Sequence, residues 1–431
     1  MTSTRRTIQV EERLPLAQTL PLSLQHLFAM FGATVLVPFL FKVNPATSLL
    51  LNGVGTLVYL VVARGRIPAY LGSSFAFIAP VLAVMADASL GGYGAAQGGF
   101  ICFGLFFILV SQIVRVAGVR WLDVLFPPAA MGAIVAVIGL ELAPVAVGMA
   151  GLAGDPPAGA LYSSGGAIGT AMFTLGVILL GSVLFRGFLG AIPVLIGTAA
   201  GYGLALGLGM VDLAPVRAAP WLAVPTLYAP SFQPAAILMI MPAALVVLAE
   251  HIGHLVVTGN IVGRDLVKDP GLHRSLLGDG ISNVLSGLAG ATPNTTYGEN
   301  IGVMAITRVY SVWVIGGAAV IAVLIAFVGK LGALIRSIPQ PVMGGVCLLL
   351  FGVIAAAGIR MLVEKKVDYT QPRNLILSSV VLVSGIGGVT VKMGTVHLKG
   401  MALGTVVSIA LSLLFALFDR LGWMNDGGAG Q

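Results

Sequence analysis

The chain has 431 residues, of which 58% are hydrophobic and only 9% are charged. Soluble domains carry about 25% charged residues, so this composition excludes a soluble globular protein and predicts a polytopic membrane protein. The net charge of +7 could indicate a nucleic-acid partner. The cations, however, fall in short gaps between apolar segments, where they set membrane topology, and we expect no nucleic-acid partner.

Fourteen apolar segments are candidates for membrane spans, each of which needs about 20 apolar residues unless it is broken. They cover residues 17–41, 46–63, 68–87, 95–114, 122–143, 165–185, 187–210, 235–258, 275–290, 292–307, 309–329, 338–358, 374–391 and 400–418. The third and tenth segments are the shortest and most polar, so each is predicted to be a strand-like piece followed by a half-helix. We expect an all-α polytopic membrane protein with 14 transmembrane segments and short strands in segments 3 and 10.

The positions of lysine and arginine predict which side of the membrane each connection occupies. With the N-terminus inside, seventeen of the 23 Lys and Arg residues lie on the inner side of the predicted spans. Cytoplasmic connections carry an excess of these residues, so both termini are predicted to be cytoplasmic. The pair Lys330 and Arg336 runs against this assignment, because both fall on the predicted outer side.

An internal echo divides the chain into two halves. The stretch 338–345 repeats the pattern of 126–133, and Gln25-His26 precedes Glu250-His251 by a spacing similar to that between the two polar spans. Two halves of seven spans must be inverted relative to each other, because seven is odd. Inverted repeats with a pair of interrupted helices are typical of secondary transporters, whose site lies near the membrane midplane. A chance echo is the alternative, and the matched interruptions count against it.

The stretch from Thr292 to Arg308 is polar and rich in helix breakers, although it lies between apolar segments. Such sequence is tolerated at membrane depth only where it is buried in protein or lines a cavity. An ionisable residue there, Glu299, marks a candidate functional site. Gly298 lets the backbone bend and lets a ligand approach the main chain closely. We interpret this stretch as a substrate site built at a broken helix.

Glu250 and His254 lie four residues apart and share one face of a predicted helix. A carboxylate beside an imidazole can share or relay a proton, which suits proton coupling; a satisfied structural pair is the alternative. His251 points about 100° away from Glu250 on such a helix, and a packing or polar-contact role is equally open. Together with Glu299, Glu250 offers two acceptors for a ligand with two N–H groups, through charge-assisted hydrogen bonds.

An aromatic side chain in the third segment, Phe75, could stack on a flat ring. The backbone N–H groups around Phe75 and Gly298 could serve ring carbonyls, whereas a lipid-facing or packing role for Phe75 is the alternative. The two cysteines, Cys102 and Cys347, each sit alone in an apolar run, without CxxC or metal-ligand spacing. We therefore expect neither a metal site nor a cofactor.

Nearly the whole chain resembles the bacterial uracil permeases, the uracil:proton symporters of the nucleobase–ascorbate transporter family. The matching stretches are Ser23–Thr34, Gly72–Phe77, Trp121–Pro128, Ala249–His254 and Pro293–Arg308. The last of these contains the family signature, Glu299-Asn300-Ile301-Gly302 followed by Thr307-Arg308.

The resemblance implies a core domain of spans 1–4 and 8–11 and a gate domain of spans 5–7 and 12–14, arranged as two inverted seven-span repeats. It also implies a short antiparallel strand in each of spans 3 and 10. The boundaries expected are residues 1–116 and 231–330 for the core, 117–230 and 331–420 for the gate, and 421–431 for a cytoplasmic tail. Family members are commonly dimers through the gate domain, so a homodimer is expected.

The resemblance also implies roles for individual residues. The positions that match substrate-site residues of the family are Glu250, Glu299, Phe75, Gly298, Tyr297 and Ala33. The two carboxylates match uracil ligands, the main chain at the phenylalanine and glycine meets the uracil carbonyls, and the tyrosine and alanine match the pocket wall. His254 matches a residue implicated in proton coupling. Phe351 departs from the pattern, because a close relative has Tyr there, so a hydroxyl near the coupling network is absent.

These observations together predict a proton-coupled uracil importer of the inner membrane, with uracil, protons and the lipid bilayer as its partners. A symporter for another nucleobase such as xanthine is the alternative in the same class, because purine and pyrimidine rings both offer N–H and C=O edges. An uncoupled facilitator or channel is the alternative in another class, and concentrative uptake would exclude it. No nucleophile–base pair, metal cluster or cofactor loop supports a membrane enzyme.

Overall fold

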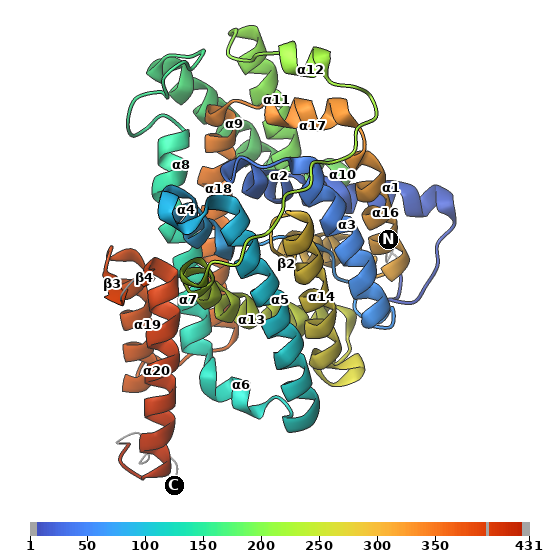
Figure 1. Cartoon of the computed structure of the whole chain (residues 1–431). Coiled ribbons are helices and arrows are strands. Elements are labelled where there is room, and N and C mark those ends of the chain that lie inside the picture. The colour runs from blue at the N-terminus through green and yellow to red at the C-terminus, as the bar shows by residue number, and fades with distance from the viewer. Residues whose placement is uncertain (1–6, 394–395, 425–431) are drawn as a thin grey trace.

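The computed structural model describes residues 7–393 and 396–424, and these residues are mostly helical (Figure 1). Eight helical segments are long and apolar enough to cross a membrane: Leu16–Leu40, Pro45–Val62, Gly92–Ala117, Pro128–Met149, Ser164–Leu184, Pro234–Val262, Gln340–Glu364 and Gly400–Arg420. Four shorter apolar helices accompany them: Phe75–Ala86, Pro193–Gly207, Val312–Ala326 and Pro372–Ile386. The chain is therefore an integral membrane protein, as its composition predicts. The predicted tail, 421–431, lies outside the described residues beyond Met424.

One set of helices, here called the first bundle, draws on both halves of the chain (Figure 1). It contains α1 (Leu16–Ala29), α2 (Phe31–Leu40), α3 (Pro45–Val62), α4 (Ile78–Ala86), α5 (Gly92–Ala117), α13 (Pro234–Val262), α14 (Leu272–Ala289), α15 (Gly298–Thr307) and α16 (Val312–Ala326). The short helices η1 (Phe75–Phe77), η2 (Ala88–Leu90) and η3 (Val267–Gly271) belong to its connections. Gly104 of α5 and Gly280 of α14 face each other so closely that a Cβ on either would press on the other's carbonyl oxygen. Small residues allow membrane helices to approach in this way.

The remaining long helices form a second bundle (Figure 1). It contains α6 (Arg120–Leu125), α7 (Pro128–Glu141), α8 (Ala143–Met149), α9 (Ser164–Leu184), α10 (Gly187–Gly190), α11 (Pro193–Gly207), α18 (Gln340–Glu364), α19 (Pro372–Ile386) and α20 (Gly400–Arg420). Helices α7 and α18 each follow a proline, Pro127 and Pro339, at the two places where the sequence echoes itself. Proline suits a helix start, because its fixed φ and missing N–H cost nothing there. Two short helices, α12 (Ala214–Ala218) and α17 (Gly329–Arg336), lie in connections between the bundles.

Two three-residue strands pair inside the first bundle. Strand β1 (Leu71–Ser73) runs antiparallel to β2 (Asn294–Thr296), with Gly72 opposite Thr295. Each strand leads into a helix that continues in its own direction, η1 and α4 after β1 and α15 after β2. The pairing satisfies backbone groups of the buried strands, which would otherwise be costly at membrane depth.

A second hairpin, β3 (Thr390–Met393) with β4 (Val396–Lys399), lies between α19 and α20. The sequence-based prediction of a helical span over 374–391 is wrong at its C-terminal end, because α19 ends at Ile386. Gly387 and Gly388 follow, and Gly388 has a φ of +70°, which ends the helix. The next three residues are the β-branched Val389, Thr390 and Val391, which favour an extended strand.

Candidate substrate site

The paired strands bring the starts of two half-helices next to each other. Beyond the ladder, Ser74 N donates to Pro293 O at 2.8 Å and Tyr297 N donates to Tyr70 O at 2.9 Å. Immediately after these bonds η1 begins at Phe75 and α15 begins at Gly298. The first N–H groups of a helix have no partner within it and form the positive end of its dipole. Two sets of N–H donors therefore flank the strand crossing.

Tyr297 fills the space between the strands and α2. Its hydroxyl donates to Ser73 O at 3.1 Å, and its ring covers Gly72, where a Cβ would clash with it. Tyr297 is 4% exposed and belongs to one buried cluster with Ala33, against which Phe75 also packs. The two residues predicted to form the pocket wall therefore lie together.

Helix α13 carries Glu250 and His254 to the start of α15. His254 Nδ1 lies 3.1 Å from Thr296 Oγ1, and a Cβ on Gly298 would lie 3.4 Å from His254 Nε2. Glu250, one turn earlier, is close enough to Glu299 for their charges to interact. Both glutamates are half-buried and Gly298 is exposed, so the first turn of α15 borders open space. The structure thus brings the predicted carboxylates, histidine and glycine into one region.

An aromatic contact links this region to the second bundle. Phe351 of α18 meets Phe75 edge to face, with ring centroids 6.3 Å apart and planes at 84°. Phe351 is 1% exposed. The site therefore lies where the two bundles meet, with its carboxylates on one bundle and this buried phenyl ring, which has no hydroxyl, on the other.

A buried ion pair lies behind the site, and the sequence-based reasoning missed its acidic member. His251 Nδ1 lies 2.8 Å from Asp279 Oδ2 of α14, with both side chains 0% exposed. His251 Nε2 lies 2.7 Å from Ser275 Oγ, which in turn lies 2.7 Å from the Tyr59 hydroxyl. The open question about His251 is thus answered by a polar-contact position that fixes α13 to α14 and α3.

The same acidic side chain connects to strand β2. Asn283 Nδ2 donates to Asp279 Oδ1 at 2.9 Å and to Asn294 O at 2.9 Å, while Asn294 N donates to Asn283 Oδ1 at 2.7 Å. One amide side chain thereby supplies both partners of a strand residue. Asp279, through Asn283, therefore helps to set the position of the segment that ends in Glu299.

Strand β1 is held from the other side by polar side chains of α3. Thr56 Oγ1 accepts from Leu71 N at 2.9 Å, and Asn52 Nδ2 donates to Ser73 Oγ at 3.4 Å. A spacing of four residues places Asn52 and Thr56 on one face of α3, as it does Asp279 and Asn283 on α14. Polar residues four apart in otherwise apolar segments were the signal that could have found both supports.

Helix α15 is also tied to α1. Asn300 Nδ2 lies 3.0 Å from His26 Nδ1 and donates to His26 O at 3.2 Å, with both residues buried. The bond fixes the first turn of α15, next to Glu299. Within residues 7–393 and 396–424, no group of three His, Cys, Asp or Glu side chains could hold a metal ion.

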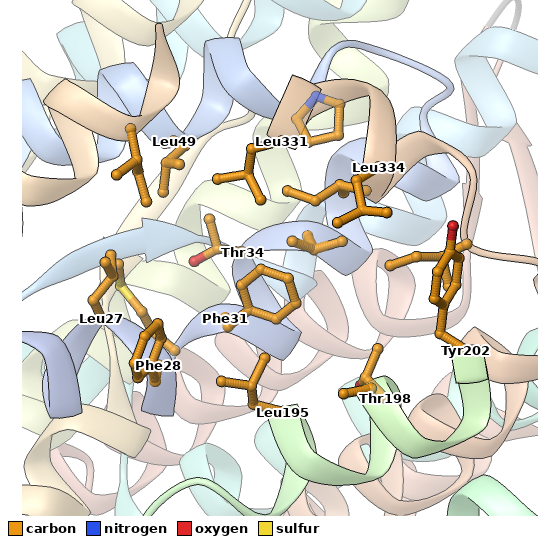
Figure 2. A pocket seen from close by; sticks show the side chains of 17 residues that line it. Leu27, Phe28, Phe31, Thr34, Leu49, Leu195, Thr198, Tyr202, Leu331 and Leu334 are labelled. Atoms are coloured by element: carbon orange, nitrogen blue, oxygen red, sulfur yellow. The ribbon is translucent and has the colours of Figure 1, made fainter. Parts of the chain in front are cut away.

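A separate cavity of about 330 Å³ lies between α1, α2 and α11 and beneath α17 (Figure 2). Its lining is apolar apart from the hydroxyls of Thr34, Thr198 and Tyr202. Thr198 Oγ1 already donates to Val194 O at 2.8 Å, and the Tyr202 hydroxyl lies 2.7 Å from Ser337 Oγ. A polar ring would leave its groups unsatisfied here, so the carboxylate region is the better substrate site.

Comparisons with known proteins agree with this geometry. Residues 17–394 match the family model Xan_ur_permease, described as a permease family. The chain is 63% identical to the "Uracil permease" of Escherichia coli (strain K12), over 97% of this chain and 96% of that protein. It is 58% identical to the "Uracil permease" of Paenibacillus larvae, over 98% and 99%. The inward-facing structure of the murine anion transporter Slc26a9 shares the fold, with a TM-score of 0.68 and 12% identity, covering 95% of this chain and 69% of that one.

Proposed function

The chain belongs to the permease family that includes the bacterial uracil permeases, and from this membership we propose that it imports uracil across the inner membrane together with protons. This is a family of transporters and not of enzymes. Uracil is a flat ring with two N–H donors and two carbonyl acceptors. A site for it needs two good acceptors and two donors around one ring.

The observation that carries the proposal is the meeting of two carboxylates with two helix starts. In the proposed complex, Glu250 and Glu299 accept the ring N–H groups through charge-assisted hydrogen bonds. The main-chain N–H groups at Phe75 and Gly298 donate to the ring carbonyls, because helix starts leave such donors free. Gly298 suits this role because its backbone is exposed to the open space in front of α15.

The walls of the proposed pocket come from Tyr297 and Ala33, with the ring of Phe75 stacking on uracil. Support comes from the buried cluster that joins these three side chains next to the strand crossing. Stacked aromatic rings add about 0.5–1.5 kcal/mol beyond the area that they bury.

Proton coupling is proposed to run through Glu250 and His254. The two residues lie one turn apart on α13, with His254 within 3.1 Å of Thr296 on the strand that leads to Glu299. A proton on or near Glu250 would favour entry of uracil, since two bare carboxylates in one site repel each other. His254 would act through the charge state of Glu250 and not as a direct ligand.

The proposed architecture has fourteen spans in two inverted halves of seven. The eight long segments, the four shorter apolar helices, α14 and α15 together supply that number. We equate the first bundle with the core domain, 1–116 and 231–330, and the second with the gate domain, 117–230 and 331–420. Both termini are proposed to be cytoplasmic, and a homodimer is proposed to form through the gate. Movement of one bundle against the other would open the site to each side in turn.

The test of the function is uptake of labelled uracil into vesicles that contain the purified chain. Accumulation should require an imposed proton gradient, inside alkaline, and collapse with a protonophore at fixed sodium. Competition by thymine, cytosine, xanthine and uric acid separates uracil from other nucleobases, and preferential block by xanthine would refute the uracil assignment. Accumulation that survives the protonophore and follows sodium would refute proton coupling, and mere equilibration would indicate a facilitator.

The role of His254 has its own test, in which binding and transport are measured on the same variant. His254→Ala should reduce proton-driven uptake much more than equilibrium binding of uracil, because the ring contacts remain. Thr296→Val is a matched variant that removes only the hydroxyl lying against His254. Loss of binding in His254→Ala as complete as in a carboxylate variant would contradict the separation of coupling from binding.

A further inference from the structure

The cavity of about 330 Å³ lies at the junction of the two bundles and outside the proposed uracil site. Figure 2 shows Leu331 and Leu334 of α17 on one side, Leu195 and Thr198 of α11 on the opposite side, and Phe31 of α2 between them. Helix α17 therefore forms a cover over a hollow whose floor belongs to the second bundle. An occupant of this cavity would contact both bundles at once.

The chemistry of the lining selects an apolar occupant. The volume falls at the lower end of the range for ligand sites, about 300–1,000 Å³. Two of the three lining hydroxyls already bond within the protein. Apolar cavities of this kind do not hold water well and accept apolar molecules instead.

The rim of the cavity faces the membrane. Two of its lining residues, Ala199 of α11 and Leu334 of α17, are exposed. In a chain that spans a bilayer, exposed apolar side chains of this sort contact lipid. The hydrocarbon of the bilayer therefore has a direct path to the cavity.

The cover of the cavity is amphipathic. Leu331, Leu334 and Ile335 of α17 line the cavity, whereas Arg336 is exposed. Lys330 Nζ donates to Val216 O at 3.2 Å and to Arg217 O at 3.1 Å, at the end of α12.

Helices α12 and α17 thus hold three cations together, Arg217, Lys330 and Arg336. The acidic side chain of this region is Asp212, whose Oδ1 accepts a hydrogen bond from Ala214 N at 2.8 Å. These cations lie on the predicted outer side, where the distribution of Lys and Arg disfavours them. An anionic group held at this surface would account for their position.

We propose that the cavity binds an acyl chain of an anionic phospholipid, with its phosphate on Arg217 and Arg336. The apolar chain passes between Ala199 and Leu334 and lies beneath α17, while the headgroup stays at the surface. Basic residues near a membrane surface attract anionic lipids, and apolar burial holds their chains. This lipid site is independent of whether uracil or another nucleobase is carried.

The first test is native mass spectrometry of the full chain, titrated with phosphatidylglycerol or with phosphatidylcholine of the same acyl chains. Ala199→Phe places a ring across the mouth of the cavity and should weaken the tightest phosphatidylglycerol binding at least tenfold. Ala200→Phe is the matched control, because the next residue of α11 does not line the cavity, and it should bind like the parent. Parental affinity in Ala199→Phe would overturn the proposal.

The headgroup and the location are tested separately. Arg217→Gln with Arg336→Gln should remove the preference for phosphatidylglycerol over phosphatidylcholine, whereas Lys392→Gln, an exposed cation on β3, should leave it unchanged. Parent protein in vesicles that contain phosphatidylglycerol with a photoreactive acyl chain should be labelled on peptides of α11 and α17. This arm uses the unaltered chain, so it decides the matter even if a substitution unfolds the protein. Equal binding of both lipids by the parent, or labelling confined to other surfaces, would refute the site.

Discussion

The side chain at position 299 separates the effect of charge from the effect of shape. Glu299→Gln keeps the size of the side chain but replaces an acceptor oxygen by an NH₂ group, which would face a ring N–H donor to donor. An unsatisfied polar pair in a dry site costs about 1–3 kcal/mol or more. Uracil affinity should therefore fall roughly tenfold to over a hundredfold, measured by equilibrium binding to purified protein. Unchanged affinity would show that this carboxylate is not a ligand.

Asp279 is the residue whose loss should affect both stability and the site, although it lies behind the binding region. Removing one partner of a buried ion pair typically destabilises a protein by about 3–5 kcal/mol. Asp279→Ala should lower the temperature of unfolding in detergent and weaken uracil binding, because His251 loses its partner and Asn283 loses a support for β2.

Asp279→Asn serves as the conservative variant and should restore much of the stability through a neutral hydrogen bond. Ser408→Ala is the control for buried polar groups, because Ser408 Oγ has no hydrogen-bond partner among the residues that the structure describes. Parental stability and binding in Asp279→Ala would mean that the ion pair does not position the site.

At the scale of elements, the segment 7–13 acts as a strap across the inner ends of the helices that carry the site. Ile8 N donates to Arg308 O, and Tyr310 N donates to Ile8 O, each at 2.9 Å, directly after α15. Arg264, directly after α13, donates from Nη2 to Glu11 Oε2 at 2.9 Å. One short segment thus joins the end of the helix with Glu250 to the end of the helix with Glu299.

The ion pair in this strap predicts a small dependence of stability on pH. The Arg264 guanidinium lowers the pKa of the Glu11 carboxyl, chiefly through their hydrogen bond. A carboxyl with a lowered pKa stabilises the folded state above its unfolded value, about 4.3, and loses that contribution as pH falls through the folded pKa.

A double-mutant cycle with Glu11→Gln and Arg264→Gln should therefore give a coupling of at most about 1 kcal/mol at pH 7, because the pair is largely exposed. The coupling should shrink in acid below the unfolded pKa of the carboxyl. Thermal unfolding in detergent measures it, and a coupling that grows on acidification would contradict the assignment.

At the scale of the whole molecule, the two bundles touch where α2 meets α11. A Cβ on Gly32 would lie 3.7 Å from Val194 Cβ, close to the mean Cβ separation of about 3.8 Å in disulfides. Gly32→Cys with Val194→Cys, in a chain lacking Cys102 and Cys347, should therefore cross-link readily. If the bundles move against each other, oxidation should arrest uracil uptake and leave equilibrium binding intact.

Each single cysteine variant, treated with the same oxidant, is the control for this cross-link, and reduction should restore uptake. Full uptake by a completely cross-linked sample would show that this contact stays closed throughout the transport cycle.

Much of this organisation is predictable from apolar segment length and from polar residues in the wrong place. The stretch around Glu299 stands out because a carboxylate between membrane spans demands a reason. Asp279 is equally polar, yet it escaped notice because its partner His251 is distant in the sequence and only the packing of α13 on α14 joins them. The hairpin at β3 and β4 escaped because a hydropathy pattern does not distinguish a short β-branched run from the last turns of a helix.

The pairing of β1 with β2 also sets an order of events during biosynthesis. Leu71 and its partner Thr296 are separated by more than half of the chain, so the first strand enters the membrane long before the second is synthesised. During that interval the Thr56 hydroxyl, which already accepts from Leu71 N, can shelter one exposed amide of the waiting strand. A nascent chain released before residue 296 holds half of a crossing and an unpaired edge. The cell's quality control can recognise that edge as the sign of an unfinished carrier.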